Sequence, residues 1–99
     1  MDKTMPMDES TYHNLCDELF AGMETLLDDA DADYFRSGGV LEIETESGNK
    51  IIVSRQTPLR EIWVAEKTAG RHFKMQDGEW IDTLSARPLL PYLKSLLAD

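Results

Sequence analysis

The sequence predicts an α+β fold, a two-layer sandwich in which an N-terminal and a C-terminal helix pack on one face of an antiparallel sheet of about five strands. Three observations support this prediction: apolar residues at helical spacing near both ends, apolar–polar alternation between them, and short turns between the alternating segments. Short turns join antiparallel neighbours, and two helices with one apolar face each must cover the same face of the sheet. The length of 99 residues and the apolar content of 41% fit one domain.

The first helix is expected to begin near Ser10. Asp8 and Glu9 supply the N-cap and first-turn acids that a helix start favours. From there, apolar residues recur at spacings of three and four, and they are Tyr12, Leu15, Cys16, Leu19, Phe20, Met23, Leu26 and Leu27. We therefore expect residues 1–9 to form a flexible N-terminal tail and residues 10–99 to form the single domain.

The middle of the chain predicts five strands. In order, their segments are "VLEIETE" from Val40, "IIVSRQ" from Ile51, "EIWVAEK" from Glu61, "RHFKM" from Arg71 and "EWID" from Glu79. The segments "SGG", "SGNK", "TPL" and "QDG" read as breaks or turns around them. In the third strand, Ile62 and Val64 take the buried face, so Trp63 should point towards solvent.

The C-terminal segment "RPLLPYLKSLLAD" predicts the second helix. Pro88 suits the first helical position, and Pro91 still lies in the first turn, where a missing N–H matters little. The apolar stripe of this helix consists of Leu89, Leu90, Leu93, Leu96 and Leu97. This stripe supplies the second apolar face that the sheet requires.

The charge balance narrows the choice of partners. The chain has 10 Lys plus Arg against 19 Asp plus Glu, a net charge of -9. This charge argues against a nucleic acid or an anionic membrane as partner and favours a cation or a basic protein surface. One cysteine excludes an internal disulfide and a thiolate metal cage. The start of the chain lacks the pattern of a secretory signal, and its apolar runs are too short for a membrane span, so we expect a cytoplasmic protein.

Acidic residues concentrate along the first helix and at its end, in "LLDDADAD". On a helical wheel, one flank collects His13, Asp17, Glu24, Asp28 and Asp31, with Asp29 and Asp33 close by. We call the six acids of this set the acidic ridge. Glu42, Glu44 and Glu46, on the solvent face of the first predicted strand, extend the negative field.

The acidic ridge has two interpretations. A solvated charged face is the usual reason for such a pattern. However, few basic residues are interleaved on this helix, and the acids become denser towards its C-terminal end, where the helix dipole disfavours them. Local stability is given up there, which points to a function.

A carboxylate ridge can bind hard cations or dock a basic protein surface. A calcium loop of the EF-hand type is excluded, because Tyr34 stands where the loop needs Gly and Val40 where it needs Glu. Carboxylates on a helix surface enclose no cage, so any metal would bind weakly. His13 can add a nitrogen ligand or be an ordinary surface histidine.

Little else in the sequence points to chemistry. His72 reads as a structural or surface residue, and Cys16 lies in the apolar stripe as a small core residue. Trp63, exposed on an open sheet face, is a good contact for a partner protein, and Arg55 stands near it in sequence. The chain has no P-loop, GxGxxG or HExxH motif, so an enzyme has little support.

The segments "GGVL", "SGNKIIVSRQ", "PLREIWVA" and "HF…DGEWI", in this order and spacing, closely resemble the sheet of the frataxin family, in particular its bacterial members. The N-terminal "YHNLCDELF…LLDDADAD" is similar to the family's first helix with its acidic ridge. The resemblance covers about Ser10 to Leu97. One departure is Arg36, in a segment where family members often carry more acids.

The resemblance implies a protein that binds Fe²⁺ and Fe³⁺ weakly and interacts with the cysteine desulfurase and the scaffold protein of iron–sulfur cluster assembly. It implies that the iron ligands are Glu24, Asp28, Asp29, Asp31 and Asp33, with His13 as a further candidate. The residues expected to contact partners are Trp63, Asp17, Glu42, Glu44 and Arg55. The expected state is mainly monomeric, with oligomers that depend on iron.

Three functional hypotheses follow from these observations. The leading one is a non-enzymatic iron-binding accessory of iron–sulfur cluster assembly. The alternative is a metal-independent acidic module that regulates a basic partner enzyme. A weaker third is an acidic mimic of nucleic acid, which would require competition with DNA for a basic protein.

Overall fold

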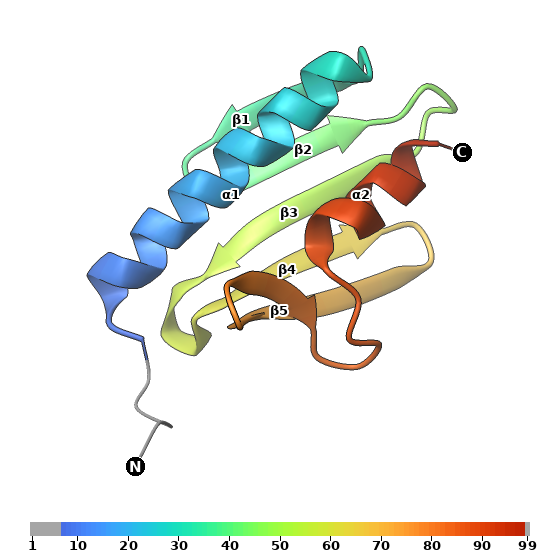
Figure 1. The fold of residues 1–99 in the computed structure, drawn as a ribbon. Coiled ribbons are helices and arrows are strands. Elements are labelled where there is room, and N and C mark those ends of the chain that lie inside the picture. The colour runs from blue at the N-terminus through green and yellow to red at the C-terminus, as the bar shows by residue number, and fades with distance from the viewer. Residues whose placement is uncertain (1–6, 99) are drawn as a thin grey trace.

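The structure, a computed structural model that describes residues 7–98, has two layers (Figure 1). In chain order its elements are α1 (Glu9–Asp29), β1 (Asp33–Ser37), β2 (Val40–Glu44), β3 (Lys50–Gln56), the 3₁₀ turn η1 (Thr57–Leu59), β4 (Glu61–Glu66), β5 (Ala69–Gln76), β6 (Glu79–Asp82) and α2 (Leu89–Leu97). The strands form one antiparallel sheet in the order β1-β2-β3-β4-β5-β6. Both helices cover the same face of this sheet, so the predicted sandwich is confirmed (Figure 1).

The sheet has one strand more than the five predicted. The additional strand is β1, which pairs with β2 so that Tyr34 lies opposite Ile43 and Arg36 opposite Leu41. Ile43 and Leu41 are buried under the helices, so Tyr34 and Arg36 are on the helix-facing side. Phe35, on the solvent side, is 65% exposed. Tyr34 packs against the core as a strand pattern requires, but Phe35 and Arg36 reverse the usual apolar–polar alternation, which explains why the sequence pattern did not reveal this strand.

The long helix α1 begins at Glu9, one residue before the predicted start. Asp8 is its N-cap, and the carboxylate Oδ1 of Asp8 accepts a hydrogen bond of 2.7 Å from the Thr11 N–H. Asp8 and Glu9 therefore belong to the helix start and not to the predicted tail at residues 1–9. Most of that predicted tail, residues 1–6, lies outside the described residues. The helix ends at Asp29 without a basic residue in its last turn.

The hydrophobic core lies between the helices and the sheet. Fully buried side chains of α1 pack with those of β2, β3 and β4 in one cluster, as the periodicities predicted. They include Phe20, Met23, Leu41, Val53 and Ile62. The short helix α2 adds Leu89, Tyr92 and Leu93. Pro88 is the N-cap of α2 and not its first helical residue, which corrects the prediction by one position.

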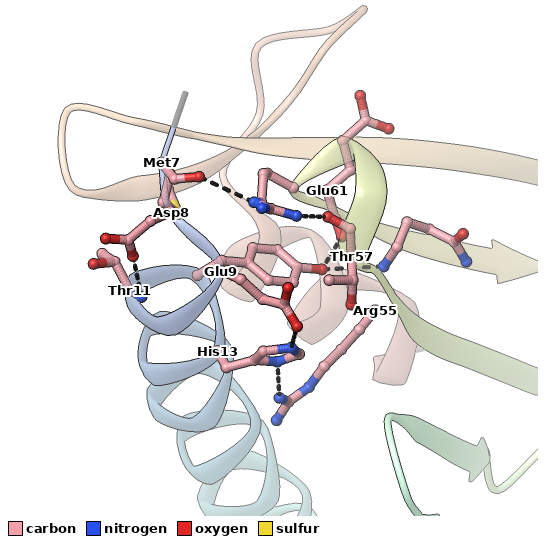
Figure 2. A network of polar contacts seen from close by, with 11 residues as sticks. Met7, Asp8, Glu9, Thr11, His13, Arg55, Thr57 and Glu61 are labelled. Atoms are coloured by element: carbon pink, nitrogen blue, oxygen red, sulfur yellow. Dashed lines mark hydrogen bonds and ion pairs between the residues drawn. The ribbon is translucent and has the colours of Figure 1, made fainter. Parts of the chain in front are cut away.

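The start of α1 is fastened to the turn between β3 and β4 (Figure 2). The buried Tyr12 hydroxyl donates to the Glu61 carbonyl at 2.6 Å and accepts the Gln56 N–H at 3.1 Å. Arg60, in the left-handed region at φ 55°, donates to the carbonyls of Met7 and Thr57. Burial raises the pKa of Tyr12, which keeps the hydroxyl protonated as a donor. These contacts fix how the first turns of α1 lie over β3.

Candidate functional site: the acidic ridge and the open sheet face

The residues of the acidic ridge belong to three successive pieces of backbone. Asp17, Glu24, Asp28 and Asp29 are on α1; the remaining two, Asp31 and Asp33, are in the following turn and at the first position of β1. Asp31 has a φ of 56° and is therefore not on the helix, although the wheel had placed it on the helical flank. Within the ridge, Glu24 is half-buried and the five aspartates are exposed.

Two arginines from the sheet reach the ridge from beneath. Arg55 on β3 donates through Nη2 to Asp17 Oδ1 at 2.6 Å. Arg36 on β1 pairs through Nη1 with Glu24 Oε2 at 3.5 Å. The helical period shows only the basic residues on the helix itself, whereas these two cations come from strands, at positions 12 and 38 residues away in the chain.

Both arginines also pack on the buried ring of Phe20. The guanidinium carbon of Arg36 lies 5.0 Å from the ring centroid, and that of Arg55 lies 4.9 Å from it. Such cation–π contacts hold the two guanidiniums in place. The hydrogen bond from Arg55 lowers the pKa of the exposed Asp17 carboxyl.

His13 is engaged at both ring nitrogens (Figure 2). Its Nδ1 lies 2.9 Å from Arg55 Nη1, and its Nε2 lies 3.7 Å from Glu9 Oε2. An arginine can only donate, so this contact assigns Nδ1 as the acceptor and places the proton of a neutral imidazole on Nε2. His13 therefore belongs to the same polar cluster as Asp17, on the side of the ridge that Arg55 supports.

The C-terminal end of the ridge is different. Among residues 7–98, Asp28 Oδ1 accepts from the Tyr34 hydroxyl at 2.9 Å, and no side-chain hydrogen bond or ion pair reaches Asp29, Asp31 or Asp33. Nor does this part of the chain gather three His, Cys, Asp or Glu side chains closely enough to form a metal-binding group. The end of the ridge is an open negative surface and not a preformed cage.

Trp63 lies on the sheet face that carries no helix, as predicted, and is half-buried there. Its ring stacks on His72, with centroids 4.4 Å apart and planes 9° apart, and its Nε1 donates to Glu61 Oε1 at 2.8 Å. The stack results from the direct pairing of Trp63 with His72 across β4 and β5. The sequence alone does not predict this contact, because the pairing of the two residues depends on the register of the β4–β5 hairpin.

The other predicted contact residues divide between the two faces. Glu42 and Glu44 are exposed on the open face, opposite Phe35 and Asp33 of β1. Arg55, in contrast, points under α1 and is only 13% exposed at its side chain. It is close to Trp63 in sequence but lies on the opposite side of the sheet.

These observations define a small α+β domain with an open sheet face and an acidic edge. No helix within residues 7–98 has the length and hydropathy needed to cross a membrane. The family model described as the frataxin-like domain matches residues 5–99. The chain belongs to the frataxin family, as the resemblance predicted.

Relatives of known name agree with this assignment. The chain is 44% identical over 90 residues to the iron-sulfur cluster assembly protein CyaY of Vibrio cholerae, which covers 89% of this chain and 86% of that protein. It is 51% identical over 79 residues to the protein of the same name from Paraburkholderia phymatum, over 78% and 75% of the two chains. The family to which the chain belongs thus acts in iron–sulfur cluster assembly.

Solved structures share the fold. Frataxin from Psychromonas ingrahamii, studied for stability modulation within the CyaY family, matches with a TM-score of 0.86 and 32% identity over 92% of this chain and 89% of that one. Trimeric yeast frataxin, solved in complex with ferrous iron, matches with a TM-score of 0.69 and 24% identity, over 99% and 88%. At the latter identity the likeness concerns the fold.

Proposed function

We propose that this protein is a non-enzymatic, iron-binding accessory of iron–sulfur cluster assembly. The observation that carries the proposal is the exposed group Asp29, Asp31 and Asp33, which receives no side-chain donor within residues 7–98. Negative charge at the end of a helix is unfavourable locally, so its retention calls for a ligand or partner. Membership of the frataxin family supplies the biological setting.

Iron would bind as cargo on the acidic ridge. Fe²⁺ and Fe³⁺ accept carboxylate oxygen ligands, and the proposed set is Glu24, Asp28, Asp29, Asp31 and Asp33, with His13 as an additional nitrogen ligand. Because the described side chains form no closed metal group, the ion would keep much of its water. Binding would therefore be weak and exchangeable, which suits a protein that passes iron on or senses its supply.

The partners we propose are the cysteine desulfurase and the scaffold protein of the same pathway. Trp63 with Glu42 and Glu44 on the open sheet face, and Asp17 with Arg55 at the ridge, would form the contact surface. An aromatic ring flanked by acids suits a partner surface that is basic at its rim. The protein would be mainly monomeric, and iron bridging the ridges of two copies would favour oligomers.

An anaerobic titration with Fe²⁺, followed through backbone amide NMR signals, tests iron binding. We expect the signals of residues 28–33 to shift or broaden first, and the triple variant D29N/D31N/D33N to lose this response. The variant K67Q, changed in the distant β4–β5 turn, serves as the control that should respond like the wild type. Shifts that spare residues 28–33 would show that iron binds elsewhere.

A metal-independent interaction module is the second candidate, and the absence of a gathered metal-binding group within residues 7–98 favours it. A pull-down of the desulfurase with wild type, W63A and D28K/D31K separates the two. Both candidates expect weaker capture by the two variants. Capture that is unchanged by an iron chelator would favour the metal-independent module, and capture that requires iron would favour the first.

A further inference from the structure

The acidic ridge is divided by the arginines of the sheet. Its N-terminal part, Asp17 and Glu24 with the adjacent His13, is in contact with Arg55 or Arg36. Its C-terminal part, residues 28–33, receives no arginine contact within the described chain. Both parts are rich in acids, but in the N-terminal part the negative charge is partly neutralised by arginine, and in the C-terminal part, within residues 7–98, it is not.

Arg55 is more firmly held than the acid that it contacts, whereas Arg36 and its partner Glu24 are about equally exposed, at 36% and 29% of their side chains. The Arg55 side chain is 13% exposed, whereas its partner Asp17 is 63% exposed. Both guanidiniums also lie about 5 Å from the centroid of the buried Phe20 ring, at the distances given above. An acid can swing away into solvent, but a guanidinium that moves away loses its aromatic contact and its place beneath the helix.

A metal ion at Asp17 or Glu24 has to compete with a tethered cation. The guanidinium is part of the same folded chain, so its effective concentration at the carboxylate is high. If the carboxylate turns outward to bind a metal, the remaining guanidinium still repels a second positive charge nearby. His13 Nδ1 is closed in the same way, because it accepts from Arg55.

We propose that Arg36 and Arg55 are selectivity residues that exclude metal ions from the N-terminal part of the ridge and confine them to residues 28–33. This inference rests on the proposed function, because it concerns where the ridge takes its cation. It narrows the ligand set: Glu24 and His13 become available only when the arginines are removed. Arg36 also explains the departure from the acids common at this segment, as a residue that shortens the metal-binding surface.

The test looks for a gain of metal binding in a variant that lacks the exposed aspartates at positions 29, 31 and 33. Mn²⁺ serves as the probe, because it takes the same oxygen ligands and broadens nearby amide signals. In the triple variant D29N/D31N/D33N, we expect little broadening at residues 13–24. Adding R55Q should bring broadening centred on residues 13–17, and adding R36Q should bring broadening centred on residue 24.

Two further variants control for fold and charge. R55K keeps a positive charge in place of Arg55 and should leave residues 13–17 unbroadened. K67Q removes the same charge as R55Q but in the β4–β5 turn, and it should also leave them unbroadened. Dispersed amide spectra verify that each variant is folded, and R36Q provides the test at a more exposed position if R55Q unfolds.

Each outcome decides between the ideas. Broadening at residues 13–24 in the triple variant with both arginines present would overturn the inference while leaving metal binding intact. Equal gains from R55Q and K67Q, or no gain from R36Q and R55Q together, would also overturn it. Undiminished broadening at residues 28–33 in the triple variant would instead contradict the proposed ligand group.

Discussion

Two acidic regions of this protein are treated in opposite ways by the fold. Asp82, at the end of β6, is 3% exposed and accepts from Leu84 N–H and Ser85 Oγ at 2.9 Å and from Arg71 Nη1 at 3.0 Å. Asp29 and Asp31, at the end of α1, are exposed and receive no such side-chain donors within residues 7–98. The fold supports the first acid completely and leaves the second group open.

The network around Asp82 joins several elements. Arg71 Nε donates to the Tyr92 hydroxyl at 3.2 Å, and that hydroxyl donates to Glu66 Oε2 at 2.9 Å. Burial alone would raise the pKa of Asp82, but the hydrogen bonds from Leu84, Ser85 and Arg71 outweigh it and lower the pKa. The comparison teaches that this fold surrounds the buried Asp82 carboxylate with donors and leaves the exposed carboxylates of Asp29 and Asp31 without side-chain donors among the described residues.

The largest effect is expected when the supported acid is removed. D82A should lower the free energy of unfolding by about 3 kcal/mol, because it leaves Arg71 and the Leu84 N–H without their buried partner. Urea unfolding followed by far-UV circular dichroism measures this change. A loss below about 1 kcal/mol would mean that water replaces the carboxylate and that the network is not structural.

The contribution of Asp82 to the free energy of unfolding should also depend on pH. The pKa of Asp82 is lower in the folded protein than in the unfolded chain, so its stabilisation is complete above the unfolded value, about 3.9, and disappears as the pH falls through the folded value. The slope for one proton is at most about 1.4 kcal/mol per pH unit. Urea unfolding of wild type and D82N can be measured between about pH 5 and about pH 2. The free energies of unfolding of the two proteins should converge as the pH falls. Parallel curves would contradict this assignment.

A smaller loss is expected for Y92F. This variant removes the hydroxyl that joins Arg71 to Glu66 but keeps the aromatic ring in the core. The free energy of unfolding should fall by about 1 kcal/mol. Thermal unfolding of Y92F beside D82A measures it, and a loss equal to that of D82A would show that the network acts as one unit.

The smallest effect should have the opposite sign. D29N/D31N should raise the free energy of unfolding by about 0.5 kcal/mol, because it removes negative charge from the end of α1 and Asn tolerates the left-handed backbone at position 31. Urea unfolding at low salt measures it. A destabilised variant would show that these aspartates have structural partners after all.

The sequence predicted the elements whose side chains alternate as the core requires. The stripe of α1 and the face of Trp63 follow from local spacing alone, and the structure places both as expected. In contrast, β1 has Arg36 on the helix side and Phe35 on the solvent side, so its pattern is that of a loop.

Of the candidate site, only the acidic residues could be predicted from the sequence. Their positions on α1 can be read from the helical period, but Arg36 and Arg55 reach them from strands, and that approach depends on the register of the sheet and on where α1 crosses it. The Trp63–His72 stack likewise depends on the pairing of two strands. One sequence alone does not determine these long-range placements.

Arg36 has a second consequence, for aggregation. The sheet ends at β1, whose outer edge leaves backbone groups free of a neighbouring strand among the described residues. A charged side chain that points inward from an edge strand hinders the addition of a further strand from another molecule. Arg36 points towards the helix layer and is anchored on Phe20, so the residue that we propose to limit metal binding should also protect this edge against sheet extension. Changing Arg36 should therefore alter the solubility of the protein as well as the cation binding that we propose.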